Sequence, residues 1–309
     1  MYEDQNDTDR LRAGLFDCDR RLAREWEKRA ALLDEWAEQD ARAFLSSDLP
    51  FSERFARLPS GFPAFSLPSD TPEGARAALL LAAGGGTAAL RPAYIRALLA
   101  RLHEGGCNVT PADLLPVGAP ENERISYVKS PLADEAYYLF AAGLTAPTVQ
   151  YADRFRSCCE DVANGTVGYC ILPYENTDGV LSSLAALADR YRLCCSALCR
   201  VFHADGANVT HFALYSKTIP PPGEGGTYRL RLSLSCPDGR EVSSHLLAAA
   251  AHGTEVVHLS ALPPEEGEGG LLCHLTVRLS YPQLLPYLTD LAVFGNAVVF
   301  HGLYKESAI

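Results

Sequence analysis

The sequence has 309 residues, of which 48% are hydrophobic, so the chain can bury a core and form two or three domains. Its formal net charge of -11 argues against binding to nucleic acid, which requires a basic surface. Residues 2–7 have neither the basic nor the apolar region of a signal peptide, and the apolar stretches are too short to cross a bilayer. We therefore expect a cytoplasmic protein that binds neither nucleic acid nor membrane.

The ten cysteines do not have the spacing of a metal site. The sequence contains no C-x-x-C pair and no run of cysteine and histidine with zinc-finger spacing. In a cytoplasmic protein such thiols are reduced and pack as small hydrophobic groups. The sequence therefore predicts no disulfide, no metal and no cofactor.

The N-terminal part of the sequence has helical patterns throughout. Apolar residues recur at helical spacing over residues 8–45 among many charged ones, which is typical of one long helix with a solvated face. Two further helices are predicted at 73–83 and 91–103, after a proline-rich segment. We therefore predict an all-helical domain at 1–104, followed by a linker at 105–123.

The middle part alternates between strand and helix patterns, which predicts an α/β domain at 124–219. An apolar strand at 166–172 leads into a predicted loop at 173–179, and prolines and glycines at 220–226 form a second linker. The other predicted elements are strands at 124–129, 148–151, 192–202 and 209–217 and helices at 131–143, 153–163 and 180–190.

The last part of the sequence, residues 227–309, follows the order βαββαβ. This order predicts a ferredoxin-like unit of a size typical of small-molecule regulatory domains. The fold class predicted for the whole chain is α+β multidomain, with an all-helical domain, a single α/β lobe and a ferredoxin-like domain.

Two motifs in the middle domain resemble those of the prephenate dehydratases. Residues 164–177 begin with N-G, continue through an apolar strand and end in P-Y-E-N-T, where the family has P-I-E-N-S. Residues 208–212 are N-V-T-H-F, which is similar to the family's N-x-T-R-F. The two motifs occur in the family's order, and each is flanked by an apolar strand.

The resemblance implies roles for the residues of both motifs. Thr210 matches the threonine regarded as the family's main catalytic residue, whose hydroxyl assists loss of the ring hydroxyl as prephenate decarboxylates to phenylpyruvate. The other site residues implied in the same way are the pocket residues Glu175, Asn176 and Thr177, the motif residue Phe212, and His211 at the position of a substrate-binding arginine.

The domain order is similar to that of the fused chorismate mutase–prephenate dehydratase proteins of phenylalanine biosynthesis. The first helix of their mutase domain has the pattern L-R, D, L and R, and their third helix has Y-I at the place of Tyr94-Ile95. The resemblance makes Arg12 and Arg29 cations that hold a dicarboxylate substrate. It also makes the C-terminal unit an ACT domain, which senses phenylalanine in the family, and implies a homodimer with prephenate, chorismate or phenylalanine as ligand. The first-helix pattern is matched by Leu11-Arg12, Asp19, Leu22 and Arg29.

Several key groups of the family have no counterpart in this sequence. Asp40 aligns with a mutase lysine, and on the helix face of Arg29 its charge would repel a dicarboxylate. Only residues 198–208 occupy the place of the second dehydratase lobe, and eleven residues are too few to fold as one. His211 cannot pair with a carboxylate in the bidentate manner of an arginine. Residues 260–263 of the ACT-like unit are S-A-L-P, where E-S-R-P is expected.

The sequence leaves three functions open. The first is a shortened, degenerate pseudoenzyme of the family that acts as a scaffold or aromatic-metabolite sensor, with the mutase and dehydratase activities both lost. The second is an active minimal prephenate dehydratase that uses Thr210 in a site completed by a dimer partner. The third is an unrelated binding module that shares the two motifs by chance. Replacement of Thr210 by alanine separates the first two, since only the second predicts a loss of activity.

Overall fold

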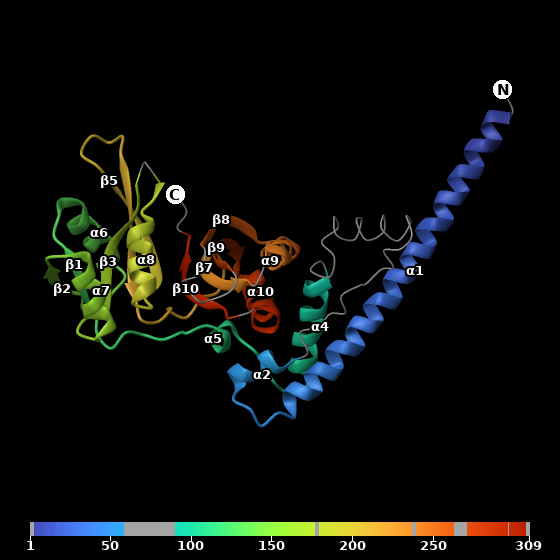
Figure 1. Cartoon of the computed structure of the whole chain (residues 1–309), viewed down its shortest axis with the longest axis horizontal. Coiled ribbons are helices and arrows are strands. Elements are labelled where there is room, and N and C mark those ends of the chain that lie inside the picture. Colours follow the sequence, from blue (N-terminus) through green and yellow to red (C-terminus); the bar gives the residue numbers. More distant parts are fainter. Residues whose placement is uncertain are drawn as a thin grey trace. The chain divides into compact units, whose positions relative to one another are not determined.

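The computed structural model describes residues 3–58, 90–176, 179–236, 239–262, 271–295 and 297–306, and the chain divides into two compact units (Figure 1). The first unit is Met1–Val109 and the second is Thr110–Ile309. The protein is of the mixed α/β type, with one large mixed sheet in the second unit. None of the described helices is long and apolar enough to cross a membrane.

The described part of the first unit is helical. The helix α1 (Glu3–Leu45) is drawn in blue in Figure 1, and α2 (Phe51–Arg57) and α4 (Arg91–Glu104) follow it in the chain. At 1.5 Å per residue α1 is about 65 Å long. Exposed pairs one turn apart, such as Asp17 with Arg21 at 2.6 Å, each stabilise such a helix by only about 0.2–0.5 kcal/mol. The predicted helix at 73–83 lies outside the described residues.

The core of this unit forms between the C-terminal half of α1 and α4. Phe44 of α1 and Phe55 of α2 are buried, as are Ile95 and Leu98 of α4. Asp40 is buried with them and accepts a 2.6 Å hydrogen bond from the hydroxyl of Tyr94.

The α/β part of the second unit contains β1 to β6, with α6 on one face and α7 and α8 on the other. Against α6 pack Ile125, Ile171 and Phe212, whereas Leu172 and Tyr215 belong to the core beside α7 and α8. This division follows from strand geometry, in which consecutive side chains point to opposite faces. The bounds are β1 Arg124–Val128, α6 Pro131–Ala141, β2 Thr148–Ala152, α7 Phe155–Ala163, β3 Tyr169–Asn176, β4 Gly179–Val180, α8 Ser182–Arg190, β5 Cys194–Phe202 and β6 Val209–Ser216.

The remainder of the chain has the predicted element order βαββαβ. Its strands lie in the order β10-β7-β9-β8 and all neighbours are antiparallel. Leu230 and Leu232 of β7 point toward a core shared with α10, which contributes Leu284 and Leu288. The bounds are β7 Thr227–Cys236, α9 Gly239–Ala251, β8 Glu255–Leu262, β9 Leu271–Ser280, α10 Tyr281–Phe294 and β10 Val299–Lys305.

The two strand groups form one continuous sheet. Its order is β2-β1-β3-β6-β5-β10-β7-β9-β8, and β4 pairs with β3. The groups join where β10 pairs in parallel with β5, at Gly302 and Cys195, while its other edge is antiparallel to β7. The sequence predicted the two groups as separate domains and contained no sign of this pairing.

Two local predictions are corrected by the structure. The loop predicted at 173–179 is wrong in its first half, because β3 continues to Asn176 and is held by pairs with β6 on one side and β4 on the other. The linker predicted at 105–123 contains a helical turn, α5 (Pro111–Leu114), which begins at a capping box formed by Thr110 and Asp113.

Candidate functional site

The hairpin between β5 and β6 occupies the place where the resemblance would require a second lobe. Its turn runs from His203 to Asn208, and Gly206 adopts a φ of 67°. The Asp205 carboxylate accepts hydrogen bonds from the backbone N–H groups of Ala207 and Asn208, both at 3.0 Å. These bonds hold the pKa of Asp205 below its ordinary value. The turn is therefore stabilised by hydrogen bonds between its own residues.

Thr210 lies two residues beyond the turn and is hydrogen-bonded to the residue at the other end of the turn. Its Oγ1 is 2.8 Å from Nε2 of His203, and the threonine is 8% exposed. The imidazole can accept the hydroxyl proton or donate to the oxygen, depending on its tautomer. His203 was not predicted as a site residue. The only feature of the sequence that could have indicated His203 is its place seven positions before Thr210. A six-residue turn brings two residues at this spacing next to each other.

The next residue of β6, His211, lies in a row of polar side chains across three strands. In the strand register His211 is opposite Glu175 of β3 and Arg200 of β5. Its Nδ1 is 3.6 Å from Oε2 of Glu175, and both side chains are about one-third exposed. Because neighbouring positions of a strand face opposite sides of the sheet, Thr210 and His211 point away from each other. The fold thus brings Glu175 and His211 together and leaves Thr210 on the other face.

The row borders a cleft of about 990 Å³. Glu175, Arg200 and His211 line it from the α/β part, and Arg229 and Lys305 line it from β7 and β10. Much of the remaining wall is apolar or aromatic, with contributions from Leu139, Phe140, Leu144, Tyr169, Leu198, Leu214, Val257 and Tyr304. A cleft of this size with a few polar groups in an apolar wall is typical of a small-molecule site.

The cleft is lined by three cations, Arg200, Arg229 and Lys305, and by two carboxylates, Glu175 and Glu306. Arg229 is paired with Glu306 at 2.8 Å, so its charge is compensated. Arg200 and Lys305 form no ion pair with any residue that the structure describes. Arg200 instead lies over the ring of Phe202, with its guanidinium carbon 5.0 Å from the ring centre. Two cations therefore remain available to a carboxylate or phosphate.

The thiol in the cleft is a poor nucleophile. Burial raises the pKa of Cys199 to about 12, so the group is a neutral thiol near pH 7. Burial likewise raises the pKa of Tyr169. Neither side chain can act as a base at neutral pH.

The other predicted site residues lie apart from the cleft or outside the described residues. Phe212 is buried in the core beside α6, two positions from Thr210 on the same face of β6. Asn176 ends β3, where it pairs with Gly179 of β4. Thr177 is not among the described residues.

The two predicted mutase cations lie on one continuous helix. Seventeen positions separate Arg12 from Arg29 on α1, a rise of about 26 Å. The side chain of Arg12 is not among those described. At this separation one small dicarboxylate cannot touch both residues of a single chain. The carboxylate of Asp40, on the same helix, accepts a hydrogen bond from the hydroxyl of Tyr94 in α4. Burial raises the pKa of Asp40.

No protein-family model matches the sequence, and no curated protein matches it. Among solved structures, the chain is similar to a protein described as a novel type of quorum-quenching acylase, at 19% identity and a TM-score of 0.46, over 60% of this chain and 96% of that one. It is similar to prephenate dehydratase from Streptococcus mutans at 16% identity and a TM-score of 0.48, over 60% and 98% of the two chains. It is also similar to prephenate dehydratase from Arthrobacter aurescens in complex with L-Phe, at 13% identity and a TM-score of 0.47, over 60% and 92%.

Proposed function

We propose that this chain is a non-catalytic relative of the chorismate mutase–prephenate dehydratase proteins, and that it binds a small aromatic carboxylate in its cleft. The two motifs around Glu175 and Thr210 support the relationship. The ligand class follows from the lining of the cleft, which combines apolar and aromatic side chains with the cations Arg200 and Lys305. That pair of cations is the observation on which the proposal rests.

The arrangement of the motif residues supports binding rather than dehydration. Thr210 is engaged by His203 on one face of β6, whereas Glu175 and His211 meet on the other. A general acid acts only within hydrogen-bond distance of the group that it protonates. A threonine that protonates a leaving hydroxyl must therefore lie beside the ligand, and Thr210 points away from the face where Glu175 and His211 would hold one. The hairpin turn at His203 supplies no second wall of α/β structure against which a substrate could be enclosed.

The same proposal covers the organisation of the chain. The helical domain at 1–104 and the ACT-like domain at 227–309 would act as assembly and sensing parts, and the chain would work as a homodimer in the cytoplasm. Phenylalanine, phenylpyruvate and prephenate are the ligands to test first, because each combines a six-membered carbon ring with a carboxylate.

Calorimetry on the purified full chain tests the ligand class. We expect at least one of these carboxylates to bind, and we expect Arg200→Gln to weaken its binding by about tenfold, because a charged hydrogen bond contributes about 1.5–3 kcal/mol. Arg156→Gln is the matched control, since Arg156 is exposed on α7 and does not line the cleft. Equal affinities for the two variants would show that the carboxylate is not held by Arg200, and absence of binding by every ligand would refute the proposal.

A turnover assay tests the non-catalytic part separately. We expect phenylpyruvate to form from prephenate at the spontaneous rate, with no difference between the wild-type chain and Thr210→Ala. Turnover that disappears in Thr210→Ala would instead establish the minimal dehydratase, with His203 as the partner of the catalytic hydroxyl.

A further inference from the structure

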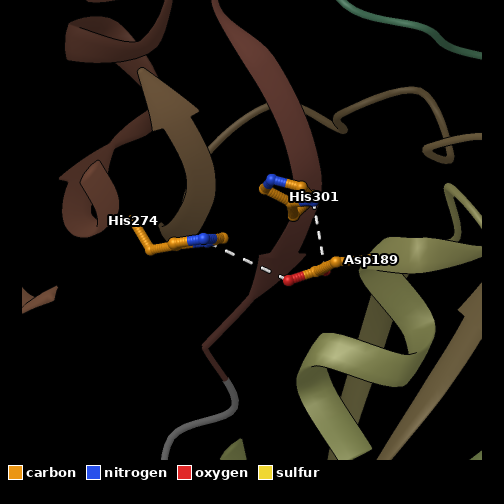
Figure 2. Close-up of side chains that lie close together, drawn as sticks. All are labelled: Asp189, His274 and His301. Carbon is orange, nitrogen blue, oxygen red and sulfur yellow. Dashed lines mark ion pairs between the residues drawn. The ribbon is translucent and has the colours of Figure 1, made fainter. Parts of the chain in front are cut away.

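A second polar cluster lies away from the cleft, where α8 meets the strands of the βαββαβ part. Figure 2 shows Asp189 of α8 facing His274 of β9 and His301 of β10. Nδ1 of His301 is 3.1 Å from Oδ1 of Asp189, and Nδ1 of His274 is 4.0 Å from Oδ2. The side chains of Asp189 and His301 are 12% and 9% exposed, and that of His274 is 24% exposed.

The sheet itself directs these side chains to one place. Ser233 of β7 pairs directly with His274 of the neighbouring β9, and β10 flanks β7 on its other side. A bulge in β10 between Phe300 and Gly302 displaces His301 from the regular register. Two imidazoles from strands that do not touch each other therefore converge, with ring centres 5.6 Å apart and planes at 29°.

The carboxylate of Asp189 is left incompletely satisfied. Its Oδ1 is buried and accepts no hydrogen bond from the described residues, although His301 lies next to it. An ionised oxygen buried without a hydrogen bond is costly, and a cation is one of the few groups that relieves it. Among the described residues, Arg231 forms an ion pair with Asp189, with its Nη2 3.6 Å from the other oxygen, Oδ2.

We propose that Asp189, His274 and His301 form a binding site for a divalent transition-metal ion such as Zn²⁺. The three donor atoms all lie within 4.8 Å of one another. Ligands at about 2.0–2.2 Å from a tetrahedral ion are separated by roughly 3.4 Å, so small side-chain rotations close the site. Two imidazoles and a carboxylate suit zinc, nickel and cobalt, and three protein ligands leave one position for water.

A further contact orients one of the ligands. Nε2 of His301 is 2.9 Å from Oγ of Ser233, which is itself buried. When the hydroxyl oxygen accepts the Nε2 proton, Nδ1 presents its lone pair toward Asp189, as a metal ligand requires. Arg231 holds the carboxylate from the other side, and its charge makes the affinity lower than that of the same three ligands alone. The bound ion joins α8 to β9 and β10, and so fixes the α/β part against the βαββαβ part.

The first test is titration of the chelator-treated full chain with Co²⁺. We expect one equivalent to bind with the visible absorption of a four- or five-coordinate ion, and we expect Zn²⁺ to displace it. His274→Ala and Asp189→Asn should each weaken binding by at least about tenfold. His103→Ala is the control for a surface histidine, since His103 lies in the other unit and contacts Asn108. No Co²⁺ binding, or unchanged binding in both ligand variants, would overturn the proposal.

The absorption spectrum separates this site from another possible one. Cys236, Glu241 and His245 also place donor atoms within 4.8 Å of one another, in the same unit. A thiolate ligand adds an intense near-ultraviolet charge-transfer band to a Co²⁺ spectrum, whereas nitrogen and oxygen ligands do not. Such a band, lost in Cys236→Ser, would place the ion at that cluster and refute the site at Asp189.

A milder variant separates the loss of metal binding from the loss of folding. Ser233→Ala keeps all three ligands and removes only the hydroxyl beside His301, so we expect Co²⁺ binding about tenfold weaker and an unchanged circular dichroism spectrum. Zn²⁺ should also raise the melting temperature of the wild-type chain and not that of His274→Ala. Equal stabilisation of both chains would again contradict the site.

Discussion

Gly302 offers the sharpest test of how the two halves of the sheet are joined. It is the residue of β10 that pairs with Cys195 of β5, and its φ is 155°. A Cβ added at Gly302 would lie 2.5 Å from the backbone oxygen of Cys195 and 2.8 Å from both its nitrogen and its Cβ. Backbone atoms cannot rotate away as a flexible side chain can, so Gly302→Ala must push β10 and β5 apart.

The expected cost has two parts. Forcing an extra methyl group into a packed interior costs about 1–3 kcal/mol. A side chain at an unfavourable backbone conformation costs a further 1–3 kcal/mol, roughly. Gly206→Ala is the matched control, because Gly206 has a φ of 67° with no atom within 4 Å of the added Cβ. The control should lose only about 1–2 kcal/mol, since it has the adverse φ without the contact.

Urea denaturation of both variants, followed by circular dichroism, measures the loss of stability. Hydrogen exchange with peptide resolution then locates it, and we expect Gly302→Ala to lose protection in β5 and β10 while β1 and β2 keep theirs. If Gly302→Ala is no less stable than Gly206→Ala and protection in β5 is unchanged, the parallel pair does not hold the sheet together and the reasoning is wrong.

Four further predictions concern other parts of the chain. Burial raises the pKa of Asp40, so the folded state binds its proton more readily than the unfolded chain. The stability that this proton adds is fully present below pH 3.8 and is lost as the pH rises through the pKa of Asp40 in the folded state. The free energy of unfolding of Asp40→Asn, measured at several pH values, should therefore increase less on acidification than that of the wild type. Tyr94→Phe, which removes the hydroxyl bonded to that carboxylate, should cost about 1–3 kcal/mol at pH 7 in the same assay, and a neutral effect would show that the bond does not stabilise the helix pair. Thr210→Val should cost about 1 kcal/mol and leave ligand affinity in the cleft unchanged, and calorimetry that finds weaker binding would place Thr210 in the site. Iodoacetamide at pH 7.5 should label the exposed Cys18 and spare Cys199, whose pKa is about 12; mass spectrometry that finds Cys199 labelled first would contradict the raised pKa.

Local patterns were enough to predict most elements. The alternation of apolar residues in β7 and β9 and the helical spacing in α1 and α4 depend on neighbours in the chain, so a single segment contains the information. The prediction was wrong at 173–176, where a proline and polar residues suggested a loop. There β3 is held by partners on both sides, and pairing with β6 outweighs the local preference.

The candidate site was predictable only where it coincides with the two motifs. Glu175 and His211 were named from the sequence, and the strand register brings them together. The separation of Thr210 from them was not predicted, because the face to which a residue points depends on where its strand begins to pair. Arg200 and Lys305 carry no motif, and only the cleft between distant strands distinguishes them from other surface cations.

The sequence by itself therefore determined most of the helices and strands, their order and the two motif segments, since each of these follows from periodicity and turn residues within short stretches. Only the tertiary structure decided which strands pair and which side chains meet. Cys195 and Gly302 are more than a hundred residues apart, and so are Asp189 and His301. Contacts over such separations arise from the packing of complete elements, and no local pattern in the chain specifies them.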